Sequence, residues 1–241
     1  MAADSGALSP RVQVAPDPRA LARRAAEWLV ERTRAAVAAR GRCALALAGG
    51  STPRETYEVL GTSALAAAVP WTAIDWFFGD ERAVPPDDPE SNYRLAAETL
   101  FAGRPEALAR ARRMPADAVD AETAAREYGR LLPDPLDIVI LGMGEDGHTA
   151  SLFPGSPALD ERVERVLPAT GSKPPLRRMT VTPPVIEHAR DVLVLVAGAG
   201  KAAMLARVLE GPLDVRAVPV QLARDRTWIV DQAAAVGLGR R

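Results

Sequence analysis

The residues best placed to do chemistry are Asp146 and His148, on a glycine-rich turn that follows the apolar run 138–141. His148 is one of only two histidines in the chain. A histidine titrates near neutral pH, so it can accept and then donate a proton during a reaction. The apolar run is typical of a buried strand, and open α/β sheets bind ligands at the carboxyl ends of such strands. This placement predicts an enzyme in which His148 is catalytic.

A second group of candidates is Gly49, Gly50, Ser51 and Thr52, between the apolar run 44–48 and a predicted helix. Glycines let the backbone approach a ligand, and the start of a helix presents unpaired N–H groups to an anion. The two hydroxyls can donate to the same anion, and a small phosphate fits this chemistry. The segment is not a P-loop, because it lacks the Gly-Lys-Ser/Thr ending. An ordinary turn with Thr52 as the helix cap is the alternative interpretation, and this segment alone does not decide between them.

Charged residues follow other predicted strands. Asp80 and Arg82 come directly after the apolar run 74–78, with a solvated ion pair in a loop as the alternative interpretation. Arg178 begins a further predicted strand. Lys201 lies in the first turn of a predicted helix, where a cation is unfavourable for the helix dipole. This position calls for an anionic partner, although a solvated lysine is the alternative.

These residues need a scaffold that brings them together, and the pattern of apolar runs and turns predicts one. Strands are predicted at 44–48, 74–78, 137–141, 179–182, 192–196 and 228–230, and helices from 18 to near 41, from 53 onward, and over 91–100, 120–132 and 199–209. Strands that alternate with helices indicate a layered α/β fold with a mostly parallel sheet. We expect residues 1–241 to form a single α/β domain in which residues 1–10 are flexible.

The bulk composition excludes several classes of protein. With 241 residues, 48% of them apolar, the chain can bury a substantial core. A net charge of −1 and scattered basic residues argue against a nucleic-acid partner. The longest apolar run, 192–199, is too short to span a bilayer, and residues 1–10 lack the pattern of a secretory signal. We therefore expect a cytoplasmic protein that binds neither nucleic acid nor membrane.

Cysteine and histidine usage gives two further expectations. Cys43 is the only cysteine, so no intrachain disulfide is possible, and we expect it to pack as a small hydrophobe. His188 lies in a helical stretch and is predicted to be structural. No histidine or cysteine lies at ligand spacing from another, which argues against a metal site.

Taken together, the motifs resemble the 6-phosphogluconolactonases, within the superfamily that also contains glucosamine-6-phosphate deaminase. The resemblance covers almost the whole chain and rests on the segments 48–53, 79–82, 91–93, 142–154, 178–180 and 197–201. It implies a Rossmann-like α/β/α fold and hydrolysis of 6-phospho-D-glucono-1,5-lactone, the second step of the oxidative pentose phosphate pathway. It implies no metal and no organic cofactor.

Two alternatives come with this resemblance. The deaminase branch typically carries a glutamate shortly after the same histidine, where this chain has Leu152 and Phe153, so the lactonase is favoured. The fold also serves as a sugar-phosphate sensor in transcription regulators. We expect no such role, because the stretch before residue 17 is too short for a helix-turn-helix module.

The resemblance and the residue types together predict the roles within the site. His148 removes a proton from the attacking water and returns it to the ring oxygen, while Arg82 stabilises the oxyanion or the ring hydroxyls and Asp80 holds Arg82 or His148 in place. The phosphate is predicted to bind the amides of residues 50–52, with Arg178 and Lys201 as counter-charges. The residues predicted to bind substrate are Gly49, Gly50, Ser51, Thr52, Asp146, Gly147, Arg178 and Lys201. The expected partner is a small phosphosugar lactone, and the expected state is a monomer or weak dimer.

Overall fold

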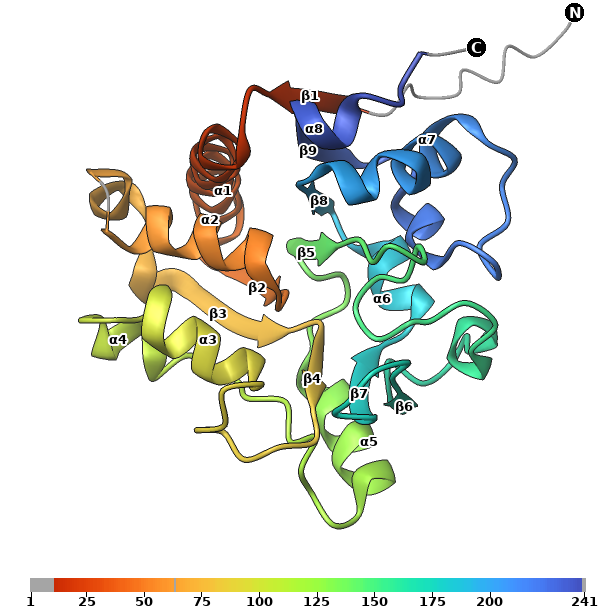
Figure 1. The fold of residues 1–241 in the computed structure, drawn as a ribbon. Coiled ribbons are helices and arrows are strands. Elements are labelled where there is room, and N and C mark those ends of the chain that lie inside the picture. Colours follow the sequence, from red (N-terminus) through yellow and green to blue (C-terminus); the bar gives the residue numbers. More distant parts are fainter. Residues whose placement is uncertain (1–10, 63, 240–241) are drawn as a thin grey trace, which may run out of the picture.

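The described part of the chain contains a main sheet of parallel strands (Figure 1). The computed structural model describes residues 11–62 and 64–239, so residues 1–10, for which flexibility is predicted, lie outside it. From edge to edge the strands are β1 (Arg11–Ala15), β9 (Thr227–Asp231), β8 (Asp191–Val196), β5 (Ile138–Gly142), β2 (Cys43–Leu47) and β3 (Ile74–Phe78). Each strand pairs in parallel with its neighbour, which confirms the predicted α/β fold with a mostly parallel sheet.

Helices cover both faces of the main sheet. In Figure 1, α1 (Pro18–Arg40) and α2 (Ser51–Thr62) lie on one side, and α6 (Pro183–His188) and α7 (Ala202–Glu210) lie on the other. The remaining helices are α3 (Asn92–Thr99), α4 (Pro105–Leu108), α5 (Ala121–Leu131) and α8 (Gln232–Ala235). Within the described residues, none of these helices has the length and apolar character needed to cross a bilayer.

The limits of α1 follow from its sequence. The Asp17 carboxylate accepts a hydrogen bond from the backbone N–H of Ala20 at 2.7 Å, and Pro18 occupies the first helical position. At the other end, the N–H of Gly41 donates to the carbonyl of Val37. The predicted start and end of this helix are therefore confirmed.

The central strands are buried on both faces, as expected for a parallel sheet covered by helices. All five residues of β2 are buried, including Cys43. Burial, with a contribution from nearby Asp137, raises the pKa of the Cys43 thiol to about 12. The thiol is therefore protonated at neutral pH and packs as a small apolar side chain, as predicted.

A second, smaller sheet was not predicted. It is antiparallel, in the order β4 (Asp80–Arg82), β7 (Arg177–Val181) and β6 (Val166–Thr170). The strand predicted at 179–182 belongs to it rather than to the main sheet. β4 has only three residues, all charged, and β6 contains Pro168, so neither shows a typical strand pattern. The proline is tolerated because β6 is an edge strand of this sheet.

The strand order reverses between β2 and β5. After β2 the chain adds β3 on one side, and then returns to add β5, β8 and β9 in turn on the other. Connections that diverge in this way leave a crevice at the carboxyl ends of the two central strands, where α/β proteins bind their ligands. β2 leads into Gly49 and Gly50, and β5 leads into the loop with His148. The topology thus predicts where the site must lie.

Candidate active site

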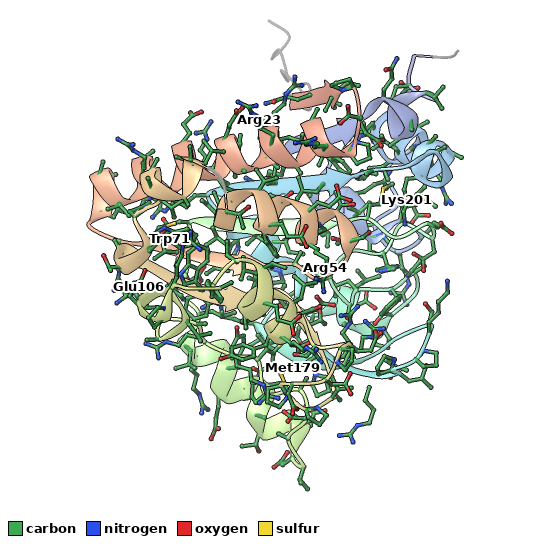
Figure 2. The ribbon with its side chains drawn as sticks, turned by 60° about the vertical axis from the view of Figure 1, so that its left-hand side comes forward. Arg23, Arg54, Trp71, Glu106, Met179 and Lys201 are labelled. Carbon is green, nitrogen blue, oxygen red and sulfur yellow. The ribbon has the colours of Figure 1, made fainter. Side chains whose placement is uncertain are left out.

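A cavity of about 270 Å³ opens at the carboxyl ends of β2, β5 and β8. Nine of the predicted site residues line it: Gly49, Gly50, Ser51, Thr52, Asp80, Arg82, His148, Arg178 and Lys201. In Figure 2, Lys201, which follows β8, and Trp71, which precedes β3, lie on opposite sides of the molecule, as expected for the two ends of a parallel sheet. The fold therefore brings these residues together, while their individual roles stay predictions.

The turn between β2 and α2 forms one wall of the cavity. α2 begins at Ser51, because the N–H of Arg54 already donates to the carbonyl of Gly50 at 3.1 Å. The prediction that Thr52 caps a helix starting at Pro53 is therefore wrong, and Thr52 lies within the first turn. The first N–H groups of this 12-residue helix therefore lie at the cavity wall, an arrangement that favours an anion.

Gly49 is required in this turn by a close approach. A Cβ at position 49 would overlap the side-chain amide of Asn92, at the start of α3. Asn92 is buried and also lines the cavity. The glycine thus lets the turn before α2 and the start of α3 pack directly against each other.

His148 is held by Asp146 on the loop after β5. Its Nδ1 lies 2.5 Å from Asp146 Oδ1, which also accepts a hydrogen bond from the His148 backbone N–H at 3.1 Å. Burial raises the pKa of the Asp146 carboxyl, but the backbone and ring N–H groups of His148 outweigh it, and the net shift is downward. When an ionised Asp146 accepts a hydrogen bond from the Nδ1–H of His148, the imidazole lone pair lies on Nε2, the nitrogen available to a ligand.

Two neighbours restrict the imidazole ring further. A Cβ at Gly144 would overlap the ring, so only glycine allows the loop to fold this tightly around it. The ring of Phe153 packs against the imidazole, with 4.6 Å between the ring centroids. His148 is therefore fixed on several sides while it still lines the cavity.

Asp80 and Arg82 reach the cavity from β4. The Asp80 carboxylate accepts hydrogen bonds from the Ser151 hydroxyl at 2.6 Å and from the Asn92 amide at 3.1 Å. Among the described residues, it forms no hydrogen bond or ion pair with Arg82 or His148. The Asn92 amide lies between Asp80 and Arg82, so Asp80 can position Arg82 only through Asn92, and its predicted role stays a prediction.

Arg178 and Lys201 supply positive charge from two other elements. Arg178, on β7, is held by the carbonyls of Pro175 and Lys173 at 3.1 and 3.3 Å. Burial lowers the pKa of its guanidinium, yet an arginine stays cationic at neutral pH. Lys201 ends the short 3-10 turn before α7, and no carboxylate in the described chain forms an ion pair with it. Together with Arg82, these side chains make the cavity attractive to an anion.

The structure also places some residues differently from the prediction. Asp146 and Gly147, predicted to bind substrate, are not among the residues that line the cavity. Asp146 lies against His148, and the carbonyl of Gly147 accepts a hydrogen bond from Val220. Asn92 belongs to the segment 91–93 that carries the resemblance, but it was not among the predicted site residues, because its contacts with Asp80 and Arg82 join positions ten or more residues apart.

The second histidine lies outside this arrangement, and the described residues offer no group of metal ligands. His188, at the end of α6, is largely exposed beside Asp134 and lies outside the cavity. Among the residues that the structure describes, no three His, Cys, Asp or Glu side chains come together as metal ligands would. That the site works without metal or cofactor stays a prediction.

Comparison with known proteins identifies the class of protein that this fold and site define. Residues 16–230 match the family model of glucosamine-6-phosphate isomerases/6-phosphogluconolactonase, and the chain belongs to this family. It is 36% identical to the 6-phosphogluconolactonase of Synechocystis sp. over 96% of this chain and 99% of that protein. The 6-phosphogluconolactonase of Rattus norvegicus is 40% identical over 81% of this chain and 80% of the relative.

A solved structure agrees with these relatives. The 6-phosphogluconolactonase from Trypanosoma cruzi superposes with a TM-score of 0.85 at 31% identity, over 98% of this chain and all of that one. The resemblance expected from the sequence motifs is thereby confirmed.

Proposed function

We propose that the protein hydrolyses 6-phospho-D-glucono-1,5-lactone to 6-phospho-D-gluconate, the second step of the oxidative pentose phosphate pathway. The observation that carries this proposal is one cavity that combines an Asp146-backed His148 with the start of α2 and three cations. In such a cavity His148 can activate a water molecule, while the start of α2 and the cations can bind a phosphate group. The relatives named 6-phosphogluconolactonase support the same reaction.

The phosphate provides the anchor. We place it against the first amides of α2, with the hydroxyls of Ser51 and Thr52 as further donors and Lys201 and Arg178 as counter-charges. A helix start and cations together favour a dianion more than either does alone. This anchoring fixes the sugar ring, so that C1 lies near His148 without a covalent bond to the enzyme.

The chemical step then needs one base. Nε2 of His148 removes a proton from water as the water oxygen bonds to C1, and the carbonyl electrons move onto the exocyclic oxygen. Arg82 stabilises this oxyanion. When the tetrahedral intermediate collapses, the bond between C1 and the ring oxygen breaks, and the imidazolium returns its proton to that oxygen. Asp146 keeps the ring in the required tautomer throughout.

Ser151 lies close to His148 in sequence, but the structure gives it another role. Its side chain is fully buried, its hydroxyl donates to Asp80, and it does not line the cavity. A covalent serine mechanism is therefore not favoured, and direct attack by water is the simpler proposal.

The deaminase alternative is not favoured. In this chain the aromatic ring of Phe153 packs on His148, where the resemblance leads one to expect a glutamate in a deaminase. Ring opening of an amino sugar would need that carboxylate as the partner of the histidine.

The direct test is a hydrolysis assay with 6-phosphogluconolactone generated in situ and corrected for spontaneous opening. The expected result is enzyme-dependent release of acid that saturates with substrate. Glucosamine 6-phosphate, assayed for ammonia, serves as the competing substrate. Ammonia release without lactone hydrolysis would overturn the proposal in favour of the deaminase.

We also propose that the enzyme is cytoplasmic, that it acts as a monomer or weak dimer, and that it requires neither nucleic acid nor membrane. The net charge of −1 supports the absence of a nucleic-acid partner. Sedimentation at several concentrations tests the assembly. A stable higher oligomer would contradict it.

A further inference from the structure

Asp80 and Arg82 carry opposite charges on the same short strand, yet they do not pair with each other. Residues two apart on a strand point to the same face, so a direct ion pair across the cavity mouth is within their reach. Among the described residues, however, no ion pair joins them. The side chain of Asn92 bonds to both instead.

The amide of Asn92 matches its two partners. Its Oδ1 accepts a hydrogen bond from Arg82 Nη1 at 2.6 Å, while its Nδ2 donates to the Asp80 carboxylate at 3.1 Å and to the Asp80 carbonyl at 2.8 Å. Only an uncharged group with a donor and an acceptor can satisfy a guanidinium and a carboxylate at once. The amide orientation is thus set by charge on both sides.

Asn92 itself is held rigidly. Its side chain is buried, its backbone N–H donates to the Glu81 carboxylate at 2.8 Å, and Gly49 packs against its amide with no space for a Cβ. Asn92 therefore connects α3, β4 and the turn before α2 at one point on the cavity wall.

Asp80 and Arg82 differ in how many of their hydrogen-bonding atoms already have a partner. The second oxygen of Asp80 is occupied by the Ser151 hydroxyl, so both oxygens of this buried carboxylate are engaged. Arg82, by contrast, keeps its buried Nε without a hydrogen-bond partner in the described chain. Its Nη1 donates to the Glu90 carbonyl at 2.7 Å as well as to Asn92, and among the described residues Nη2 has no hydrogen-bond partner, so Nη2 is the donor left for another group.

We propose that Asn92 is a positioning residue that separates Asp80 from Arg82 and so keeps the Arg82 guanidinium available to the reacting lactone. Without this amide, Asp80 would pair with Arg82 and neutralise it. The inference rests on the proposed function, because the oxyanion of the lactone is the group that Arg82 is expected to meet.

The test compares Asn92→Ala with Ser91→Ala in lactone hydrolysis and thermal unfolding. Ser91 caps α3 and donates to Glu81, so its loss disturbs the same helix start without touching Asp80 or Arg82. Asn92→Ala should lower kcat by about 10- to 100-fold, the scale of one hydrogen bond to a charged group, with KM changed far less. Ser91→Ala should lower Tm but leave kcat near that of the unsubstituted protein.

Two further variants keep the inference testable if Asn92→Ala folds poorly. Asn92→Asp is nearly isosteric, but its carboxylate would repel Asp80 and pair fully with Arg82, so we expect a similar loss of kcat. In an Arg82→Ala background, Asn92→Asp should cost little more, because its effect passes through the arginine.

The outcomes separate this inference from the proposed function. If the unsubstituted protein hydrolyses the lactone and both Asn92 variants match it in kcat, the inference is overturned and the function stands. The same holds if the losses from Asn92→Asp and Arg82→Ala simply multiply. A protein that does not hydrolyse the lactone at all overturns both.

Discussion

At the scale of single residues, the proposal that His148 is the base rests on which acceptor atoms remain unoccupied among the described residues that line the cavity. Both oxygens of Asp80, the one carboxylate that lines the cavity, are engaged by Ser151 and Asn92. His148 has its Nδ1 bonded to Asp146, and Nε2 remains for the substrate. The fold thus leaves the Nε2 lone pair of His148 unoccupied but engages both carboxylate oxygens of Asp80, which is why His148 rather than Asp80 is proposed as the base.

The substitution His148→Ala tests the proposed role of His148 as the general base. The substitution should lower kcat by about 10²–10⁴-fold, the usual contribution of a general base, because spontaneous attack by water remains. Affinity for 6-phosphogluconate, measured by calorimetry, should stay nearly the same, since the phosphate contacts lie elsewhere. Equal losses in turnover and in product affinity would count against the role as base.

Asp146 also makes a prediction about acid stability. Its pKa in the folded protein is lowered from 3.8, so the folded state favours the ionised carboxylate. The resulting stabilisation is fully present above the unfolded value and is lost as the pH falls through the lower folded value. Asp146→Asn should therefore have a lower Tm than the unsubstituted protein near about pH 6, and the difference should shrink below about pH 4.

Thermal unfolding of both proteins across this pH range is the measurement. A difference in Tm that stays constant from neutral pH to well below the carboxyl pKa would show that the pairing with His148 does not stabilise the ionised form.

At the scale of elements, the strands that could be predicted from the sequence are those with a clear local pattern of apolar residues. The strands β2, β3, β5 and β8 are apolar runs that end in small or turn residues, and each was located to within a residue or two. β4 could not be found this way, because three charged residues form a strand only through their pairing with β7. The register that places Arg82 opposite Arg178 is a tertiary property without a local signal.

The site shows the same limit. The glycine-rich turns and His148 could be predicted from the sequence, because glycines after an apolar run indicate a tight turn and a histidine in such a turn is a candidate base. Asn92 lies in the motif segment 91–93, but its place in the site was not predicted, because an asparagine after a serine is also typical of an ordinary helix start and only the folded chain shows its amide between Asp80 and Arg82.

The turn after β2 carries a prediction at this scale. Gly49→Ala would push a methyl group into the Asn92 amide, and overpacking of this kind costs about 1–3 kcal/mol of unfolding free energy. Activity should fall as well, since both the phosphate turn and the Asn92 contacts must shift. Denaturant unfolding and the lactone assay measure the two effects.

Gly129→Ala is the matched control. A Cβ at this position in α5 would meet its neighbours at an ordinary 3.5 Å. Alanine also favours a helix over glycine by about 1 kcal/mol, so this variant should be as stable as the parent or more so, with unchanged activity. If Gly49→Ala behaved like Gly129→Ala, the close packing at Gly49 would not matter for the site.

At the scale of the whole molecule, each of the two sheets contributes different residues to the cavity. The main sheet brings the α2 start, His148 and Lys201 to its carboxyl edge, and the small sheet contributes Arg82 and Arg178 from the opposite wall. The cations therefore reach the cavity from two parts of the fold: Lys201 follows β8 of the main sheet, and Arg82 and Arg178 are neighbours in the small sheet. The proposed phosphate site thus combines residues from several elements rather than from one motif.

This arrangement makes a prediction about Lys201 that separates anchoring from chemistry. Lys201→Ala should mainly raise KM for the phosphorylated lactone, by about 10-fold or more if the ammonium forms a charge-assisted bond to the phosphate. Glucono-1,5-lactone without the phosphate should be hydrolysed equally slowly by the variant and the parent, because Lys201 has nothing to contact on it. An unchanged KM for the phosphorylated lactone would remove Lys201 from the phosphate site. An equal loss with both lactones would instead place Lys201 at the reacting end of the sugar, so the two substrates together locate its charge along the ligand.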